Sequence, residues 1–237
     1  MNNNLEFNDG VYVNDNAVSK SFVSNVFAYM SLALAISGAL AYLFGTTDLI
    51  FSLVNKSGMT MLGWIVMFAP FGFILAMNFG FNKMSFTTLL AVFLGYATVM
   101  GISLSFIFLV YDLGIITKVF FITAGLFGAM AFIGYTTRTD LTKFGGILMM
   151  AVIGLVIASV VNMFMKSSQM DYIISCVGVL VFTGLTAYDV QKIKRIGAGV
   201  EFGTAETSKL ALMGALSLYL DFVNLFMFLL RVFARRD

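Results

Sequence analysis

Apolar residues occur in seven long runs along this chain, separated by short polar breaks that carry charges and turn residues. Each run is long enough to cross a hydrocarbon layer of about 30 Å as an α-helix. The pattern predicts an all-α polytopic membrane protein, with a disordered polar tail over residues 1–21 and a seven-helix domain over residues 22–237. The predicted spans are residues 22–44, 60–79, 86–110, 116–135, 144–165, 171–194 and 209–231.

The amino-acid composition also indicates a membrane protein, and it limits the functions that the sequence predicts. Hydrophobic residues make up 60% of the chain and charged residues only 11%, whereas soluble domains have about 25% charged residues. A single proline and many Phe, Met and Gly residues favour helices over the alternating strands of a barrel. The sequence has no histidine and one cysteine, Cys176, and its net charge is +2. It therefore predicts neither an enzyme, nor a bound cofactor, nor nucleic-acid binding.

Polar and small residues within the runs predict contacts between helices. Small residues recur at helical spacing in Ala124-xxx-Gly128 and Gly154-xxx-Ala158, a pattern that lets helices pack closely. Asn78 and Asn162 lie at or near membrane depth, where we expect them to hydrogen-bond between helices.

Lysine and arginine are distributed unequally between alternate loops, which predicts the orientation. A cytoplasmic N-terminus leaves only Lys56, Lys118 and Lys166 in the opposite loops. If the last run crosses the membrane fully, the basic C-terminal end lies outside, against the rule that Lys and Arg are cytoplasmic. If that run is re-entrant, the C-terminal end returns to the cytoplasm and obeys the rule. The sequence leaves both possibilities open. The cytoplasmic segments would hold Lys20, Lys83, Arg138, Lys143, Lys192, Lys194, Arg195 and Lys209.

The last run has one polar stripe. Gly214, Ser217, Asp221 and Asn224 are spaced by three and four residues, and Arg231 follows seven residues later on the same helix face. A charge at the depth of Asp221 costs a few kcal/mol on insertion scales. We therefore expect the stripe to face other helices or a water-filled cavity.

Asp189 is the acid within the preceding run. Consecutive antiparallel helices are usually neighbours, so Asp189 and Asp221 are candidates for a pair. From the predicted cytoplasmic helix ends they lie roughly 8 and 18 Å deep. Two plainer readings stand beside the pair: a solvated Asp189 paired with Lys192, and an Asp221 that hydrogen-bonds a neighbouring helix.

Two segments resemble the signature of the Bax inhibitor family. They are Phe182-Thr-Gly-Leu-Thr-Ala-Tyr-Asp-Val-Gln-Lys-Ile-Lys194 and Ala215-Leu-Ser-Leu-Tyr-Leu-Asp-Phe-Val-Asn-Leu-Phe226, the latter followed by Leu229-Leu-Arg231. The resemblance implies a seven-helix fold whose last helix is enclosed by the other six. It also implies a pH-sensitive calcium leak sensed by an aspartate pair, which maps onto Asp189 and Asp221.

The resemblance also bears on location, partners and gating. It implies a bacterial-type member, multi-pass in the inner (plasma) membrane with a cytoplasmic N-terminus, or in the ER membrane for a eukaryotic protein. The implied partners are the lipid bilayer, calcium as the transported ion, and a membrane-bound protease. Leak members carry an arginine at the end of the second span that is proposed to latch an aspartate. Here that region reads Ala76-Met-Asn-Phe-Gly-Phe-Asn-Lys83, with a single lysine, so gating would rest on the acids.

Paired carboxylates in a poorly solvated site suit this role. Ionising both carboxyl groups at once costs too much free energy, so the two share a proton. Protonated, the pair hydrogen-bonds and holds two helices together; ionised, it repels or attracts a cation. Ca²⁺ takes oxygen ligands, and Asp189 and Asp221 would offer a weak, transient metal site, with Ser217 and Asn224 in support. Tyr188 and Arg231 complete the candidate supporting residues.

Other functions remain open at this stage. A non-transporting regulator would bind a membrane protease or stress and cell-death machinery, with the aspartates serving the fold or partner contact. A coupled proton or solute antiporter is a third interpretation. An intramembrane aspartyl protease would fit Tyr188-Asp189, but Leu218-Tyr-Leu-Asp221 lacks the required Gly-x-Gly-Asp, and the single proline, Pro70, excludes the Pro-Ala-Leu motif expected later in the chain.

Overall fold

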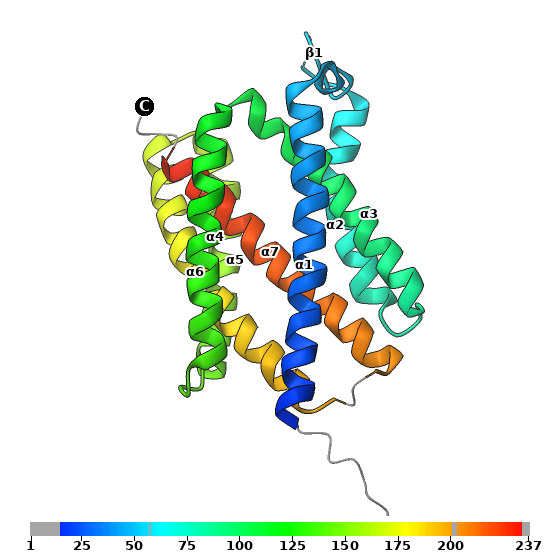
Figure 1. Ribbon diagram of the computed structural model, residues 1–237. Helices are drawn as coiled ribbons and strands as arrows, with labels where there is room; N and C mark the ends of the chain where they lie inside the picture. The colour runs from blue at the N-terminus through cyan, green and yellow to red at the C-terminus, as the bar shows by residue number, and fades with distance from the viewer. Residues whose placement is uncertain (1–14, 57, 201–202, 234–237) are drawn as a thin grey trace, which may run out of the picture.

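The computed structural model describes residues 15–56, 58–200 and 203–233. Within these ranges the chain forms seven long helices, with a short hairpin and 3-10 turns in the connections (Figure 1). The helices are α1 (Asp15–Thr46), α2 (Met61–Gly80), α3 (Phe86–Leu104), α4 (Leu113–Thr136), α5 (Thr142–Met165), α6 (Ser168–Ala198) and α7 (Ala205–Phe233). The minor elements are η1 (Asp48–Ser52), β1 (Val54–Asn55), β2 (Gly58–Met59) and η2 (Ser105–Leu109).

The seven predicted spans are confirmed as helices, the third of them as α3 followed directly by η2, and each is long and apolar enough to cross a membrane. Several helices extend beyond the predicted limits: α6 continues to Ala198 and α7 begins at Ala205. Residues 15–21 belong to α1 and not to the predicted tail, whose residues 1–14 lie outside the described part of the chain. The helices continue into less hydrophobic residues at their ends, because long polar side chains in the terminal turns reach water.

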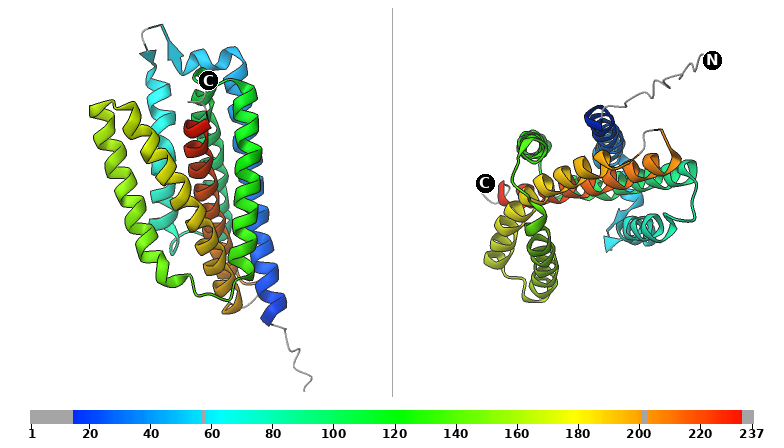
Figure 2. Two further views of the ribbon diagram at one scale, coloured as in Figure 1. Left: turned by 90° about the vertical axis from the view of Figure 1, so that its left-hand side faces the viewer. Right: turned by 90° about the horizontal axis from the view of Figure 1, so that it is seen from below.

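α7 is the most buried helix. In its most apolar stretch 61% of the residues are buried inside the protein, against 6% for α5. Its principal neighbours are α1, α3, α4 and α6, and it runs obliquely through the bundle (Figures 1 and 2). α2 packs mainly on α3 and α5 mainly on α6. α7 therefore packs chiefly against four helices, whereas the resemblance implied enclosure by all six.

α7 crosses the whole bundle. The start of α1 and the end of α7 lie at opposite ends of the molecule (Figure 1). The last run is therefore a full span and not a re-entrant segment. If α1 starts in the cytoplasm, Arg231 lies near the opposite surface, against the loop-charge rule.

The small-residue contacts differ from the prediction. Neither Gly128 nor Gly154 has any atom within 4 Å of an added Cβ, so these glycines do not bring helices together. The close approach on α4 is at Gly134, where an added Cβ would meet the backbone of Ala187 on α6. Spacing alone did not identify the face that packs.

Lys209 is a buried structural contact, although the loop-charge pattern counted it only toward topology. Its side chain is 6% exposed, and Nζ donates to the carbonyl oxygens of Phe81 at 3.1 Å and Met84 at 3.5 Å. Nζ also lies 2.9 Å from Oε1 of Glu206. The first turns of α7 are thereby tied to the α2–α3 connection.

Lys209→Met is expected to lower the free energy of unfolding by about 2 kcal/mol, because hydrogen bonds to a charged group contribute roughly 1.5–3 kcal/mol. Thermal unfolding in detergent measures the loss. The matched control is Lys83→Met, which removes an exposed lysine from the same connection. An equal loss in both variants would show that the contacts of Lys209 add nothing to stability.

Candidate functional site

The two acids meet in the structure. Asp189 on α6 and Asp221 on α7 lie within hydrogen-bonding reach of each other. Asp221 is 5% exposed, and its Oδ2 is buried without a hydrogen-bond partner among the described residues. Asp189 is partly buried. The predicted pair geometry is therefore present, and one carboxyl oxygen in it is unsatisfied.

The pair meets although its members lie at different distances along their helices. Asp189 is nine residues before the end of α6 and Asp221 sixteen residues after the start of α7, which corresponds to about 14 and 24 Å of helix. α7 runs obliquely through the bundle (Figure 1), and it packs against α6 with the two acids within reach of each other. Depth counted along straight helices would have kept them apart.

A cavity of about 250 Å³ leads to Asp189 from the bundle end where α1 starts. We call it the vestibule. Its polar side chains are Asn78, Asp189, Lys192 and Ser217, and its apolar lining comes from α1, α6 and α7. Asp221 lies behind the lining, so Asp189 is the member of the pair that faces the open space.

The side chains beyond the pair are tightly packed. Along α7 the lining changes from Ser217 in the vestibule to Phe222 in a second, largely apolar cavity of about 250 Å³ toward the other end. Leu218 and Tyr219, between them, have no exposed surface. Tyr219 Oη lies 2.7 Å from Oγ of Ser37, which donates to the carbonyl of Ala97. These buried side chains lie between the α7 residues that line the two cavities.

Of the other candidate residues, only Ser217 lies beside the pair. Ser217 shares the vestibule with Asp189. Asn224 donates to the carbonyl of Leu220 in its own helix at 2.8 Å, and Tyr188 packs against α5 at Gly145. Arg231 lies 3.9 Å from Asp171 near the opposite end. These three residues do not join the pair in this conformation.

Two vestibule residues were not assigned to the site from the sequence. Asn78 was expected to bond between helices, but its amide donates to the carbonyl of Ile74 within α2 at 2.8 Å. Lys192 was considered as an ion-pair partner of Asp189 and as a cytoplasmic charge, but not as a residue lining a cavity with Asp189. Its place three residues after Asp189 is the one sequence signal that could have identified it.

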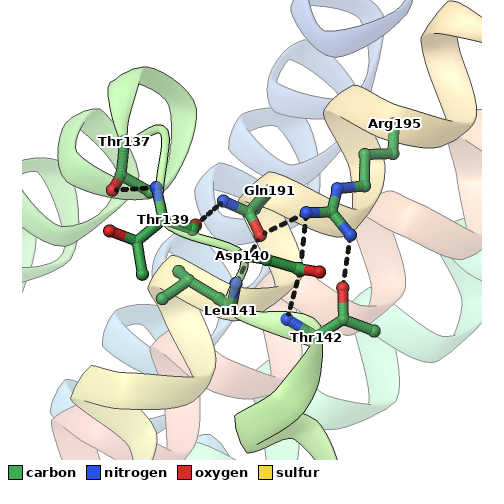
Figure 3. Close-up of polar contacts among 7 residues, drawn as sticks. All are labelled: Thr137, Thr139, Asp140, Leu141, Thr142, Gln191 and Arg195. Atoms are coloured by element: carbon green, nitrogen blue, oxygen red, sulfur yellow. Dashed lines mark hydrogen bonds and ion pairs between the residues drawn. The ribbon is translucent and has the colours of Figure 1, made fainter.

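A separate polar cluster fixes the α4–α5 connection at this end (Figure 3). Gln191, 6% exposed, donates to the carbonyl of Thr139 and accepts from the backbone of Leu141, both at 2.8 Å. Arg195 contacts Asp140 Oδ1 at 2.6 Å and also donates to Thr142. Because both α6 side chains bind the connection, its backbone is held in place.

Asp140 does not provide a pH response near neutrality. Hydrogen bonds from Thr142, and then from Arg195, lower the pKa of this exposed carboxyl. A lowered pKa contributes stability that is present above the unfolded value of about 3.9 and lost as pH falls below it. Between pH 5.5 and 8 Asp140 therefore stays ionised, and the full chain has no histidine to titrate there.

The side chains at and beside the pair supply oxygen donors. Among the described residues no group of three or more His, Cys, Asp or Glu side chains could hold a metal ion. The pair, Ser217 and the amide oxygen of Asn78 are oxygen ligands of the kind that Ca²⁺ takes. Together, fold and site define a seven-helix membrane protein with a carboxylate pair at the inner end of a vestibule.

Comparison with known proteins identifies the family within that class. The chain matches the family described as "Inhibitor of apoptosis-promoting Bax1" over residues 19–237. It is 42% identical over 219 residues to an uncharacterized protein of Borreliella burgdorferi, covering 92% of this chain and 94% of the relative. It is 37% identical over 218 residues to the inner membrane protein YbhL of Escherichia coli K12, covering 92% of each. The chain belongs to the Bax inhibitor family.

Proposed function

We propose that this protein is a pH-sensitive calcium leak whose gate is the pair Asp189 and Asp221. The observation that carries the proposal is the buried, unsatisfied oxygen of Asp221 next to a carboxyl that faces the vestibule. An unpaired buried polar atom costs roughly 1–3 kcal/mol. A functional role gives a physical reason for keeping such an atom in the core.

A shared proton would satisfy that oxygen and join α6 to α7. Loss of the proton leaves two anionic groups that repel each other unless a cation lies between them. Ca²⁺ entering through the vestibule would meet Asp189 first, with Ser217 as a further oxygen ligand. Two carboxylates bind the ion weakly enough to release it, which a leak requires.

We also propose a cytoplasmic N-terminus and an inner-membrane location. The loop charges support the orientation, and the relative YbhL is described as an inner membrane protein. In this orientation the vestibule opens to the cytoplasm, because Phe22 near the start of α1 lines it. The apolar cavity then lies toward the opposite surface.

Calcium entry into dye-loaded liposomes, measured from pH 5.5 to 8, tests the proposal. We expect pH-dependent flux with the wild type and none above empty liposomes with Asp189→Asn/Asp221→Asn. Asp171→Asn is the matched control, because it removes a half-exposed acid at the other end of α6. The sign of the response then shows whether the shared proton belongs to the closed or the open state.

Absence of wild-type flux at every pH would reject the leak. The protein would then be a regulator that binds a membrane protease or stress machinery, and a proton gradient imposed in the same liposomes would detect a coupled antiporter.

A further inference from the structure

A third cavity lies on the other face of α6, at the same end of the bundle as the vestibule. It has a volume of about 220 Å³ and includes Arg138, Lys194 and Arg195 in its lining, with no carboxylate among the lining residues. We call it the basic pocket. Lys194 and Arg195 point away from the vestibule, because the vestibule is lined by Asp189 and Lys192 on the opposite side of the helix.

The pocket's cations are positioned and not fully used within the protein. Lys194 Nζ donates to the carbonyl of Tyr135 at 2.8 Å, and this bond uses one of its three N–H groups. Arg195 is paired with Asp140. Arg138 makes no hydrogen bond or ion pair with the residues that the structure describes. The guanidinium group of Arg138 is therefore available to donate to a ligand, as are the remaining N–H groups of Lys194.

The connection that carries Arg138 is held rigid by Gln191 and Arg195 (Figure 3). A topology signal needs only a positive charge somewhere in the loop. One cation on this fixed loop and two on α6 that line the same pocket are more than that signal requires. Preorganised donors reduce the ordering cost of binding, so this arrangement favours a specific anion.

The position of the pocket indicates the source of that anion. Its lining comes from the start of α1 at Ser19, where the first span begins, and from the ends of α4 and α6. These are the levels at which lipid headgroups lie. Basic pockets between transmembrane helices bind anionic phosphate headgroups.

We propose that the basic pocket binds the phosphate group of an anionic phospholipid. The guanidinium of Arg138 and the remaining N–H groups of Lys194 would donate to the phosphate oxygens. A zwitterionic lipid would bind less well, since the lining has no carboxylate to pair with its cation. This site does not depend on calcium flux.

Native mass spectrometry of the delipidated full chain tests the proposal, with phosphatidylglycerol, phosphatidylcholine and inorganic phosphate as separate probes. We expect phosphatidylglycerol to bind preferentially and Arg138→Gln to weaken it roughly tenfold, as expected for loss of one charge-assisted contact. Arg138→Lys should recover part of the affinity. Lys143→Gln is the matched control: it removes the same charge near the same connection, outside the pocket lining.

Equal weakening by Arg138→Gln and Lys143→Gln would indicate general surface attraction and overturn the proposal. So would equal binding of the two lipids. Inorganic phosphate that binds with the same dependence on Arg138, without any preference for phosphatidylglycerol, would assign the pocket to a free anion instead. The unfolding temperature of Arg138→Gln should match the wild type, because this exposed side chain makes no contact that the fold needs.

Discussion

Asp221→Asn should abolish pH-dependent calcium flux and at the same time raise the stability of the protein. The wild-type carboxyl is 5% exposed and has an unsatisfied oxygen. The amide of asparagine has nearly the same shape, carries no charge, and can donate to Asp189 without a shared proton. Relief of one unsatisfied buried group is worth roughly 1–3 kcal/mol.

Flux and thermal unfolding measured on the same preparations separate function from structure. If Asp221 served only the fold, its replacement would lower stability, as loss of a native hydrogen bond does. A gain in stability together with loss of flux is the pattern expected of a residue kept for function at the expense of the fold. Asp171→Asn, at the half-exposed end of α6, should alter neither quantity by much.

The arrangement of the spans could be predicted from the sequence because the hydrocarbon layer imposes a length and a composition on each helix. The polar ends of α6 and α7 could not, since residues such as Arg195 and Glu206 remain helical while hydropathy falls. The two acids stood out because few acids occur in apolar runs. Their contact, however, depends on the oblique path of α7, which follows from packing across the bundle (Figure 2).

The residues around the pair were harder to predict from the sequence. Ser217 was found because it shares a helix face with Asp221, and helical spacing reports such neighbours. Asn78 belongs to α2, far away in the chain, and only the fold brings it to the vestibule. Lys209 and Gln191 likewise act on distant connections, through bonds to Phe81 and Thr139. The spacing of residue types along the sequence gives no information about these contacts.

The contact at Gly134 leads to the second large effect. A Cβ on Gly134 would lie 2.8 Å from Cα of Ala187 and 2.9 Å from its carbonyl carbon, and closer still to its carbonyl oxygen. These are backbone atoms, so the clash cannot be relieved by a rotamer change. Overpacking of this kind typically costs 1–3 kcal/mol, and more where the neighbour is rigid. We expect Gly134→Ala to destabilise the protein by about 3 kcal/mol.

The same methyl group should also alter the proposed gate, because Ala187 is two residues before Asp189 and α6 must move to accommodate it. The matched control is Gly128→Ala on the same helix, where nothing lies within 4 Å of an added Cβ. Alanine is favoured over glycine in a helix by about 1 kcal/mol, so this variant should be more stable than the wild type. Thermal unfolding in detergent therefore gives shifts of opposite sign for two identical substitutions six residues apart. Shifts of the same sign would mean that α4 and α6 are not in backbone contact at Gly134.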